Sequence, residues 1–161
     1  MPTHAEKRML PYSREQMFDL VADVERYPEF LPWCVACRIR KHESPDAFVA
    51  DLIIGFKFVR ERFTSQVTLQ RPDRIDVNYK EGPFRYLTNH WFFETDGDDR
   101  CIIDFYIDFE FRSRTMQRLI GRLFNEAVQR MVNAFERRAR TLYGPQSRPS
   151  KVLSESSSDP A

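Results

Sequence analysis

Residues 100–143 read RCIIDFYIDFEFRSRTMQRLIGRLFNEAVQRMVNAFERRARTLY, a strand pattern that passes directly into a helix pattern. In the strand, every second residue is apolar and the residues between them are mostly acidic, so one face is buried and the other meets water. The apolar positions are Ile103, Phe105, Ile107, Phe109 and Phe111. This strand predicts a sheet with one solvated face.

The helix that follows begins near Ser113 and ends after Tyr143, where Gly144 and Pro145 stop it. One side of it carries a broad apolar stripe, so it must lie across a large apolar surface. The stripe consists of Met116, Leu119, Ile120, Leu123, Phe124, Ala127, Val128, Met131, Val132, Phe135, Ala139 and Leu142.

Upstream of this stretch, several segments have the composition of strands and are separated by Pro, Gly and Asp residues typical of turns. An antiparallel meander is the simplest way to connect such strands. The expected strands are His4–Leu10, Cys34–His42, Ala47–Phe58, Val59–Gln70, Arg74–Lys80, Leu87–Thr95 and Arg100–Phe111. Ser13 and Gln16 form a capping box for a short helix after the first strand, and Pro28 and Pro32 then break the chain. The order predicts an α+β fold: a curved antiparallel sheet of about seven strands wrapped around a long C-terminal helix, with two short helices after the first strand.

A chain of 161 residues buries one core, so we expect one domain over residues 1–143. Residues 144–161 contain six Ser and three Pro and predict a disordered tail. The start lacks the apolar region of a signal peptide, and three cysteines in a chain of this size suit a reducing compartment. A cytoplasmic location is therefore expected.

Few residues point to chemistry. Cys34 and Cys37 have the spacing of a metal or redox pair, but no second pair follows, and strand geometry directs the two thiols to opposite faces. His4, His42 and His90 lie on separate segments, where surface or capping roles are expected, and no phosphate-binding glycine loop is present. We expect no catalytic residue, no metal and no cofactor.

Aromatic residues make up 14% of the chain, and Phe alone occurs 14 times. These rings either fill an ordinary core or wall an apolar ligand site between sheet and helix. On the strand at 59–70, alternation places Glu61 and Ser65 on the same face as Phe63, so they would face inward, unless the register differs and Glu61 pairs with a neighbouring arginine. Asn89 would be another polar group on an inward face.

The C-terminal helix is basic, with eight arginines against two glutamates between Arg112 and Tyr143. Arg114, Arg118, Arg122 and Arg130 fall on multiples of four residues and form a ridge opposite the apolar stripe. Such a ridge is either a solvated helix face or a contact for anionic headgroups or RNA phosphates.

Residues 11–34, PYSREQMFDLVADVERYPEFLPWC, closely resemble the signature of the coenzyme Q-binding family. FKFVRERFTSQV at 56–67, EGPFRYLTNHWFF at 81–93 and DFYIDFEF at 104–111 resemble its later blocks in the same order. The resemblance covers about residues 3–143 and implies the START-like helix-grip fold around a deep apolar cavity, with ubiquinone or a related polyisoprenoid as ligand. The family also includes a bacterial ribosome association toxin, and broader relatives include polyketide cyclases and dehydratases.

Together, these observations predict a gate at Phe30–Trp33 and Gly82–Phe84, where prolines and a glycine turn present large apolar side chains. The expected cavity and gate residues are Phe30, Leu31, Pro32, Trp33, Phe56, Phe58, Glu61, Phe63, Ser65, Phe84, Leu87, Asn89, Trp91, Phe93, Phe105, Ile107, Phe109, Leu123, Phe124 and Val128. The arginine ridge is expected to contact membrane or phosphate.

The expected function is that of a lipid chaperone that binds ubiquinone, supports ubiquinone biosynthesis and respiratory electron transport, and docks on the inner face of the membrane without being an enzyme. The alternative is a ribosome-directed factor that blocks subunit association, in which the arginines meet RNA. A small cyclase or dehydratase is a third reading, for which Glu61 is the one candidate acid or base.

Overall fold

The computed structural model describes residues 3–56, 59–97, 99–144 and 151–158. Strand β1 (Thr3–Leu10) leads into helix α1 (Arg14–Ala22) and a short 3-10 helix, η1 (Val24–Glu29). The expected capping box is present: the Ser13 hydroxyl accepts from the backbone N–H of Gln16, and the Gln16 side chain accepts from the backbone N–H of Ser13. Both predicted short helices are therefore confirmed.

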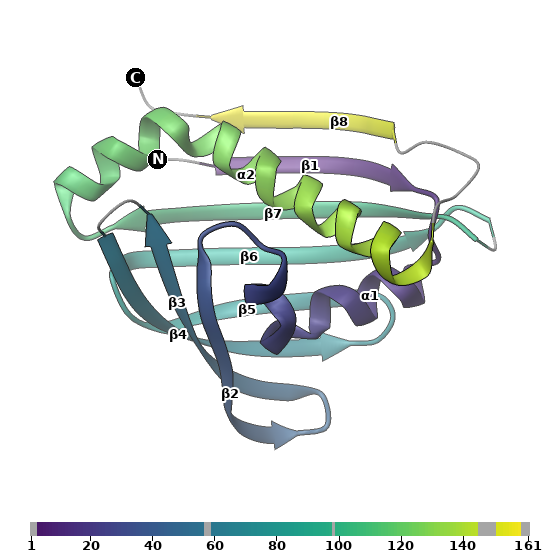
Figure 1. Ribbon diagram of the computed structural model, residues 1–161, viewed down its shortest axis with the longest axis horizontal. Helices are drawn as coiled ribbons and strands as arrows, with labels where there is room; N and C mark the ends of the chain where they lie inside the picture. The colour runs from purple at the N-terminus through teal and green to yellow at the C-terminus, as the bar shows by residue number, and fades with distance from the viewer. Residues whose placement is uncertain (1–2, 57–58, 98, 145–150, 159–161) are drawn as a thin grey trace.

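Six strands follow in a meander: β2 (Cys34–Ser44), β3 (Ala47–Phe56), β4 (Val59–Gln70), β5 (Arg74–Glu81), β6 (Phe84–Thr95) and β7 (Cys101–Phe111). Neighbouring strands pair antiparallel in the order β2-β3-β4-β5-β6-β7-β1, and the sheet curves around one side of helix α2 (Arg114–Tyr143) (Figure 1). Strand β6 begins three residues before the predicted Leu87, because Phe84 already pairs with Phe111 of β7. The predicted helix-grip arrangement is confirmed.

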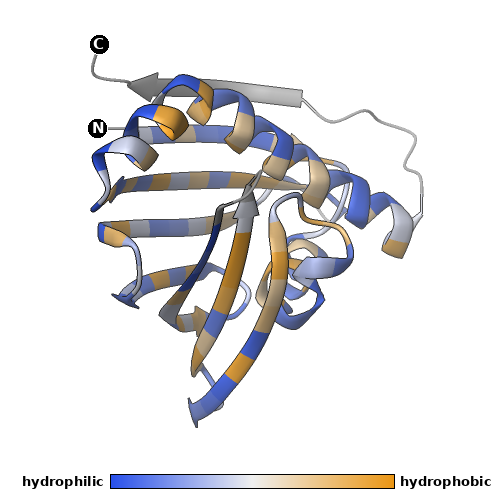
Figure 2. Ribbon diagram, turned by 60° about the vertical axis from the view of Figure 1, so that its left-hand side comes forward, coloured by the Kyte–Doolittle hydropathy of each residue, from blue (hydrophilic) through white to orange (hydrophobic). Residues whose placement is uncertain are grey.

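Alternation along the strands sorts side chains between the two faces of the sheet, and Figure 2 shows hydrophobic and hydrophilic residues succeeding one another along them. The inward face of β4 carries Phe63, Ser65 and Val67, all buried, as the sequence pattern predicts. On the core side, Trp91 of β6 contacts the rings of Phe105 and Phe135 at centroid distances of 4.7 and 5.1 Å. The aromatic core thus lies under the C-terminal half of α2.

The two halves of α2 are buried differently. All of its fully buried side chains lie between Phe124 and Ala139, whereas Arg114–Leu123 contains only partly buried or exposed residues. The helix begins with the Ser113 hydroxyl accepting from the N–H of Met116, and it ends at Gly144, whose N–H donates to the carbonyl of Arg140. The N-terminal half therefore covers a less tightly filled part of the molecule.

A buried polar cluster, made of His4, Glu6 and Arg8 on β1 with Gln129 and Glu136 on α2, joins strand to helix. Arg8 forms ion pairs with Glu6 at 2.8 Å and with Glu136 at 3.1 Å, and Gln129 donates to Glu6 at 2.9 Å. The Nε2 atom of His4 lies 3.1 Å from the Glu6 carboxylate, and the His4 side chain is fully buried. The surface or capping role expected for His4 is therefore wrong, because the inward face of β1 is polar yet covered by α2.

The sequence predicts a disordered tail over residues 144–161, but residues 151–158 form a strand in the structure. Strand β8 (Lys151–Ser158) pairs antiparallel with β1 at the edge of the sheet (Figure 1). An edge strand offers unpaired N–H and C=O groups to any extended segment, which is a physical reason for a Ser-rich segment of low hydrophobicity to pair there. In the described part of the chain, no helix is both long and apolar enough to cross a bilayer.

The turn between β5 and β6 requires glycine at residue 82. Gly82 has φ +145°, and a Cβ built there would lie 2.5 Å from the Cβ and 2.9 Å from the Cα of Phe63. Gly82→Ala should lower the free energy of unfolding by about 2–4 kcal/mol, because strain and a clash with backbone combine. Gly97→Ala is the control: φ is +86° and the space is open, so urea unfolding should show a loss of about 1–2 kcal/mol. Equal losses in both variants would contradict the close approach.

Candidate functional site

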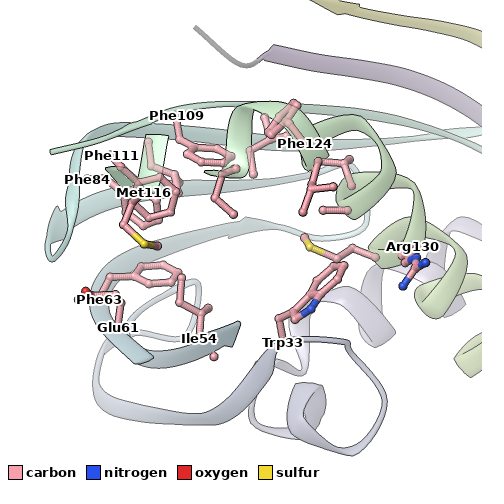
Figure 3. Close-up of a pocket in the computed structure, with 18 of the residues that line it drawn as sticks. Trp33, Ile54, Glu61, Phe63, Phe84, Phe109, Phe111, Met116, Phe124 and Arg130 are labelled. Carbon is pink, nitrogen blue, oxygen red and sulfur yellow. The ribbon is translucent and has the colours of Figure 1, made fainter. Parts of the chain in front are cut away.

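A cavity of about 380 Å³ lies between α2 and the sheet (Figure 3). Its lining residues are Trp33, Ile54, Gly55, Glu61, Phe63, Phe84, Leu87, Ile107, Phe109, Phe111, Met116, Ile120, Leu123, Phe124, Glu126, Ala127, Val128, Arg130 and Met131. Most are aliphatic or aromatic, and the charged ones are Glu61, Glu126 and Arg130. The volume falls at the lower end of the range for small-molecule sites, about 300–1,000 Å³.

Strands and helix contribute to the cavity in a regular way. Inward positions of β3 and β4 form one wall, inward positions of β6 and β7 form the opposite one, and the stripe of α2 closes the space between them. In Figure 3, Trp33, Ile54 and Phe63 face Phe109 and Phe124 across the space. The curvature of the sheet and the partial burial of the N-terminal half of α2 together leave this volume open.

Trp33 enters the cavity from the turn before β2. Its φ is +65°, in the left-handed region that bulky residues avoid, and its carbonyl accepts from the N–H of Gly55 at 2.9 Å. A residue held in this conformation has a backbone fixed by its surroundings, and such strain concentrates at functional sites. The backbone of Trp33 is therefore held in place, and its side chain lines one side of the cavity (Figure 3).

The end of the cavity opposite Trp33 is walled by an aromatic cluster of Phe63, Phe84 and Phe111. Phe84 contacts Phe63 edge to face at a centroid distance of 5.4 Å and Phe111 at 4.7 Å. The Tyr79 hydroxyl accepts from the backbone N–H of Phe84 at 3.0 Å, which fixes the start of β6. The predicted role of Phe84 as a gate requires a side chain at the surface. Phe84 is only 3% exposed, so it forms an inner wall of the cavity instead.

The polar lining residues stand at the rim. Glu126 and Arg130, one helical turn apart on α2, form an ion pair at 2.8 Å, and both side chains are about three-fifths exposed. Such an exposed pair contributes at most about 1 kcal/mol. Glu61 is partly exposed on β4. The charged lining groups thus lie at two places on the edge of an otherwise apolar cavity, with Glu61 beside Phe63 and Arg130 beside Trp33 (Figure 3).

Half of the predicted cavity residues line this space. They are Trp33, Glu61, Phe63, Phe84, Leu87, Ile107, Phe109, Leu123, Phe124 and Val128. The cavity prediction did not include Ile54, Gly55, Phe111, Met116, Ile120, Glu126, Ala127, Arg130 and Met131, of which Arg130 was expected on the arginine ridge instead. Four of these were visible as members of the apolar stripe of the helix, and Phe111 as an alternating apolar residue of the last strand.

Other predicted cavity residues pack elsewhere, so their placement on the cavity is corrected. Trp91, Phe93 and Phe105 belong to the main core, because the sheet and the C-terminal half of α2 are in direct contact there. Asn89 donates to the carbonyl of Tyr106 at 2.9 Å and accepts from the Trp91 indole. These inward residues of β6 and β7 lie on the predicted face but beyond the end of the cavity.

The corner before β2 is also only partly a cavity wall. Phe30 packs edge to face against Tyr27 and Phe135, each at 5.9 Å or less, and Leu31 packs on the core, while Pro32 lies in the turn. Ser65 is 1% exposed, and its hydroxyl has no hydrogen-bond partner among the residues that the structure describes, but it does not line the cavity. The predicted positions of Phe58 and of the Phe56 side chain lie outside the described residues.

The predicted arginine ridge divides into two parts. Arg114, Arg118 and Arg122 are exposed, and none of them makes an ion pair within the part of the chain that the structure describes. Arg130 differs, because it stands at the cavity rim and pairs with Glu126. Three unpaired cations therefore flank the part of α2 that covers the cavity.

The cysteines are all free and largely shielded. Burial raises the pKa of the Cys34 thiol to about 11 and that of the Cys37 thiol to about 12, so both are protonated at neutral pH. Across the described residues, no three His, Cys, Asp or Glu side chains are grouped as a metal site would require. A thiol buried in this way is a poor nucleophile and behaves as an apolar core residue.

Comparison with known proteins adds sequence and structural relatives. The family described as polyketide cyclase / dehydrase and lipid transport matches residues 10–136. The ribosome association toxin RatA of Pseudomonas aeruginosa is 38% identical over 145 residues, 89% of this chain and 100% of the toxin. The mitochondrial coenzyme Q-binding protein COQ10 of Drosophila melanogaster is 34% identical over 154 residues, 93% of this chain and 63% of that protein.

Solved structures share the fold at lower identity. A START superfamily protein from Mycobacterium smegmatis superposes with a TM-score of 0.76 at 18% identity, covering 88% of this chain and 99% of that one. The ZhuI aromatase/cyclase from Streptomyces sp. R1128 superposes with a TM-score of 0.75 at 17% identity, covering 88% and 96%. At these identities the likeness concerns the fold alone, which hosts different activities.

Proposed function

The chain belongs to the polyketide cyclase / dehydrase and lipid transport family, and from this premise we propose that it binds ubiquinone or a related polyisoprenoid lipid in the cavity between α2 and the sheet. The observation that carries the proposal is the apolar interior with charge only at the rim. Such a lining suits a ligand that is mostly hydrocarbon with a few polar atoms at one end. The similarity to a protein named for coenzyme Q binding supports the same ligand class.

Binding alone accounts for the site. Burying roughly 300 Å² of apolar ligand surface supplies about 7 kcal/mol before the cost of association is subtracted. The lining carboxylates are Glu61 and Glu126, and Glu126 is paired with Arg130. We therefore propose a lipid chaperone that supports ubiquinone biosynthesis and respiratory electron transport without acting as an enzyme.

The direct test is solvent extraction of gently purified protein followed by mass spectrometry, together with uptake from quinone-loaded vesicles. An isoprenoid quinone bound in about one copy per chain is the expected result. Absence of any quinone together with no uptake would overturn the proposal. A Glu61→Gln variant should bind as the parent does, whereas loss of the cellular activity with intact binding would favour a catalytic role for that carboxylate.

The proposal includes docking of the chain on the inner face of the cytoplasmic membrane through the exposed start of α2. Arg118 and Arg122 form no ion pair with any described residue and lie beside the helix segment that covers the cavity. Each basic residue near an anionic surface contributes about 1 kcal/mol. Arg118→Gln with Arg122→Gln should weaken binding to anionic vesicles roughly 10- to 30-fold in a sedimentation assay.

The matched control removes two exposed arginines from the outer face of the sheet, Arg38→Gln with Arg60→Gln. This variant has the same net charge as the helix variant but leaves α2 intact. Equal losses in the two double variants would show that net charge, and not the helix surface, governs the attachment.

A second candidate function is an action on ribosomes, which the similarity to a ribosome association toxin favours. The same arginines of α2 would then meet RNA phosphates, and the cavity would have a separate role. Co-sedimentation with ribosomal subunits that weakens steeply as salt is raised supports this candidate, whereas no co-sedimentation at low salt contradicts it.

A further inference from the structure

The size of the cavity limits how much of a polyisoprenoid it can enclose. An apolar cavity of about 150 Å³ holds one benzene molecule. The present cavity is about 380 Å³, roughly two and a half times larger, which corresponds to about 15 carbon atoms. Since an isoprene unit has five carbons, about three such units fill it, or a quinone ring with about one.

The cavity does not continue into the core. Phe109 and Phe124 close that side with ring centroids 5.2 Å apart, and beyond them Trp91 packs against Phe105 at 4.7 Å. The next void there, between the sheet and the C-terminal half of α2, has about 10 Å³, which is room for one water molecule. A chain of isoprene units therefore has no path through the described core.

Three phenylalanines form the wall at the opposite end. Phe63, Phe84 and Phe111 are each less than a tenth exposed and pack against one another and against Phe109. The cavity opens past partly exposed and exposed rim residues, which include Trp33 and Arg130 at one end and Glu61 and Met116 at the other. A tail longer than the cavity must leave through this rim.

We infer that, if the proposed ligand class is right, the chain encloses only a short section of the lipid, equal to about three isoprene units, while the rest of a long tail stays outside the protein. A ring carbonyl buried without a hydrogen-bond partner is unfavourable, and the charged lining groups stand only at the rim. The ring therefore rests at the rim near Arg130, and the isoprene units next to it fill the interior. The chain thus leaves the rest of a long tail outside the cavity, and that part of the tail stays in the bilayer while the chain is docked on it.

Affinity as a function of tail length tests this inference. Calorimetric titration uses ubiquinones with zero to five isoprene units, presented below their solubility limits. Each unit that is fully buried should raise the affinity more than about tenfold, so the affinity should climb over the first two or three units and then change less than about twofold per unit. A rise that continues at the same slope through five units overturns the inference.

A variant with a larger cavity sharpens the test. Met116→Ala with Leu123→Ala removes two partly exposed lining side chains and should move the plateau to a tail about one isoprene unit longer. Met9→Ala, on the outer face of β1, is the control and should leave the series unchanged. An unmoved plateau in the enlarged variant also contradicts the inference. No binding by any member of the series is a different result, because it refutes the proposed function itself.

Discussion

An Arg8→Met variant should lose about 3–5 kcal/mol of unfolding free energy, because it leaves the Glu6 carboxylate buried without its cation. The Glu6 side chain is 1% exposed and its carboxylate lies 2.8 Å from the Arg8 guanidinium. Arg8 also donates to Asn133 at 2.8 Å and pairs with Glu136, so the variant removes the main polar attachment of β1 to α2. Few other single substitutions of a charged residue in this chain should cost as much.

Urea unfolding of the parent and the variant measures the effect, with Lys7→Met as the matched control. Lys7 is the exposed neighbour on β1, and its replacement should change the unfolding free energy by less than about 0.5 kcal/mol. A Glu6→Leu/Arg8→Met double variant removes both charges and should recover part of the loss. A single variant within 1 kcal/mol of the parent would show that the cluster is not the attachment that the geometry indicates.

The same cluster sets a dependence of stability on pH. Burial by itself raises the pKa of Glu6, but the hydrogen bond from His4 and the charge of Arg8 together hold that pKa below its ordinary value of 4.5. A carboxyl group whose pKa is lower in the folded state stabilises the protein above pH 4.5, and this contribution disappears as pH falls through the folded-state pKa. Unfolding free energies measured between pH 3 and 6 should therefore fall with acidification, and less steeply in Arg8→Met.

The cluster also shows where sequence reasoning stops. Alternation along HAEKRML predicts a strand, but the side that faces inward is His4, Glu6 and Arg8, which no hydrophobic pattern marks as buried. Its partners lie more than 120 residues away on α2, so burial depends on a tertiary contact that local sequence cannot reveal. By contrast, β7 and α2 were predictable in kind and position, because their periodicity is strong and each is bounded by turn or capping residues.

The cavity shows a second limit of prediction from sequence. Phe105 and Phe109 lie on one face of the same strand, and the sequence gives no reason to separate them. The structure places Phe105 in the core, against Trp91, and Phe109 on the cavity wall. The difference arises from how α2 is seated: its fully buried side chains begin only at Phe124. The alternating face could be predicted from sequence, whereas the place along that face where packing gives way to empty space could not.

That empty space provides the most direct test of binding, and Ala127→Trp should reduce quinone affinity more than about 100-fold. Ala127 lies on the lining face of α2, and an indole added there occupies volume that is now open. Because the side chain enters an existing void, the strain of overpacking a filled core is avoided and thermal stability should be preserved, apart from a helix-propensity cost of roughly 0.5 kcal/mol.

Asn125→Trp is the matched control, since it introduces the same side chain two residues away on the exposed face of α2. Asn and Trp have similar helix propensities, so this substitution carries almost no propensity cost, and it should leave quinone affinity within about twofold of the parent value. The comparison separates occupation of the cavity from any general effect of tryptophan on the helix. If Ala127→Trp folds and still binds ubiquinone as the parent does, the lipid lies elsewhere. The apolar walls between α2 and the sheet would then be packing surface and not a binding site.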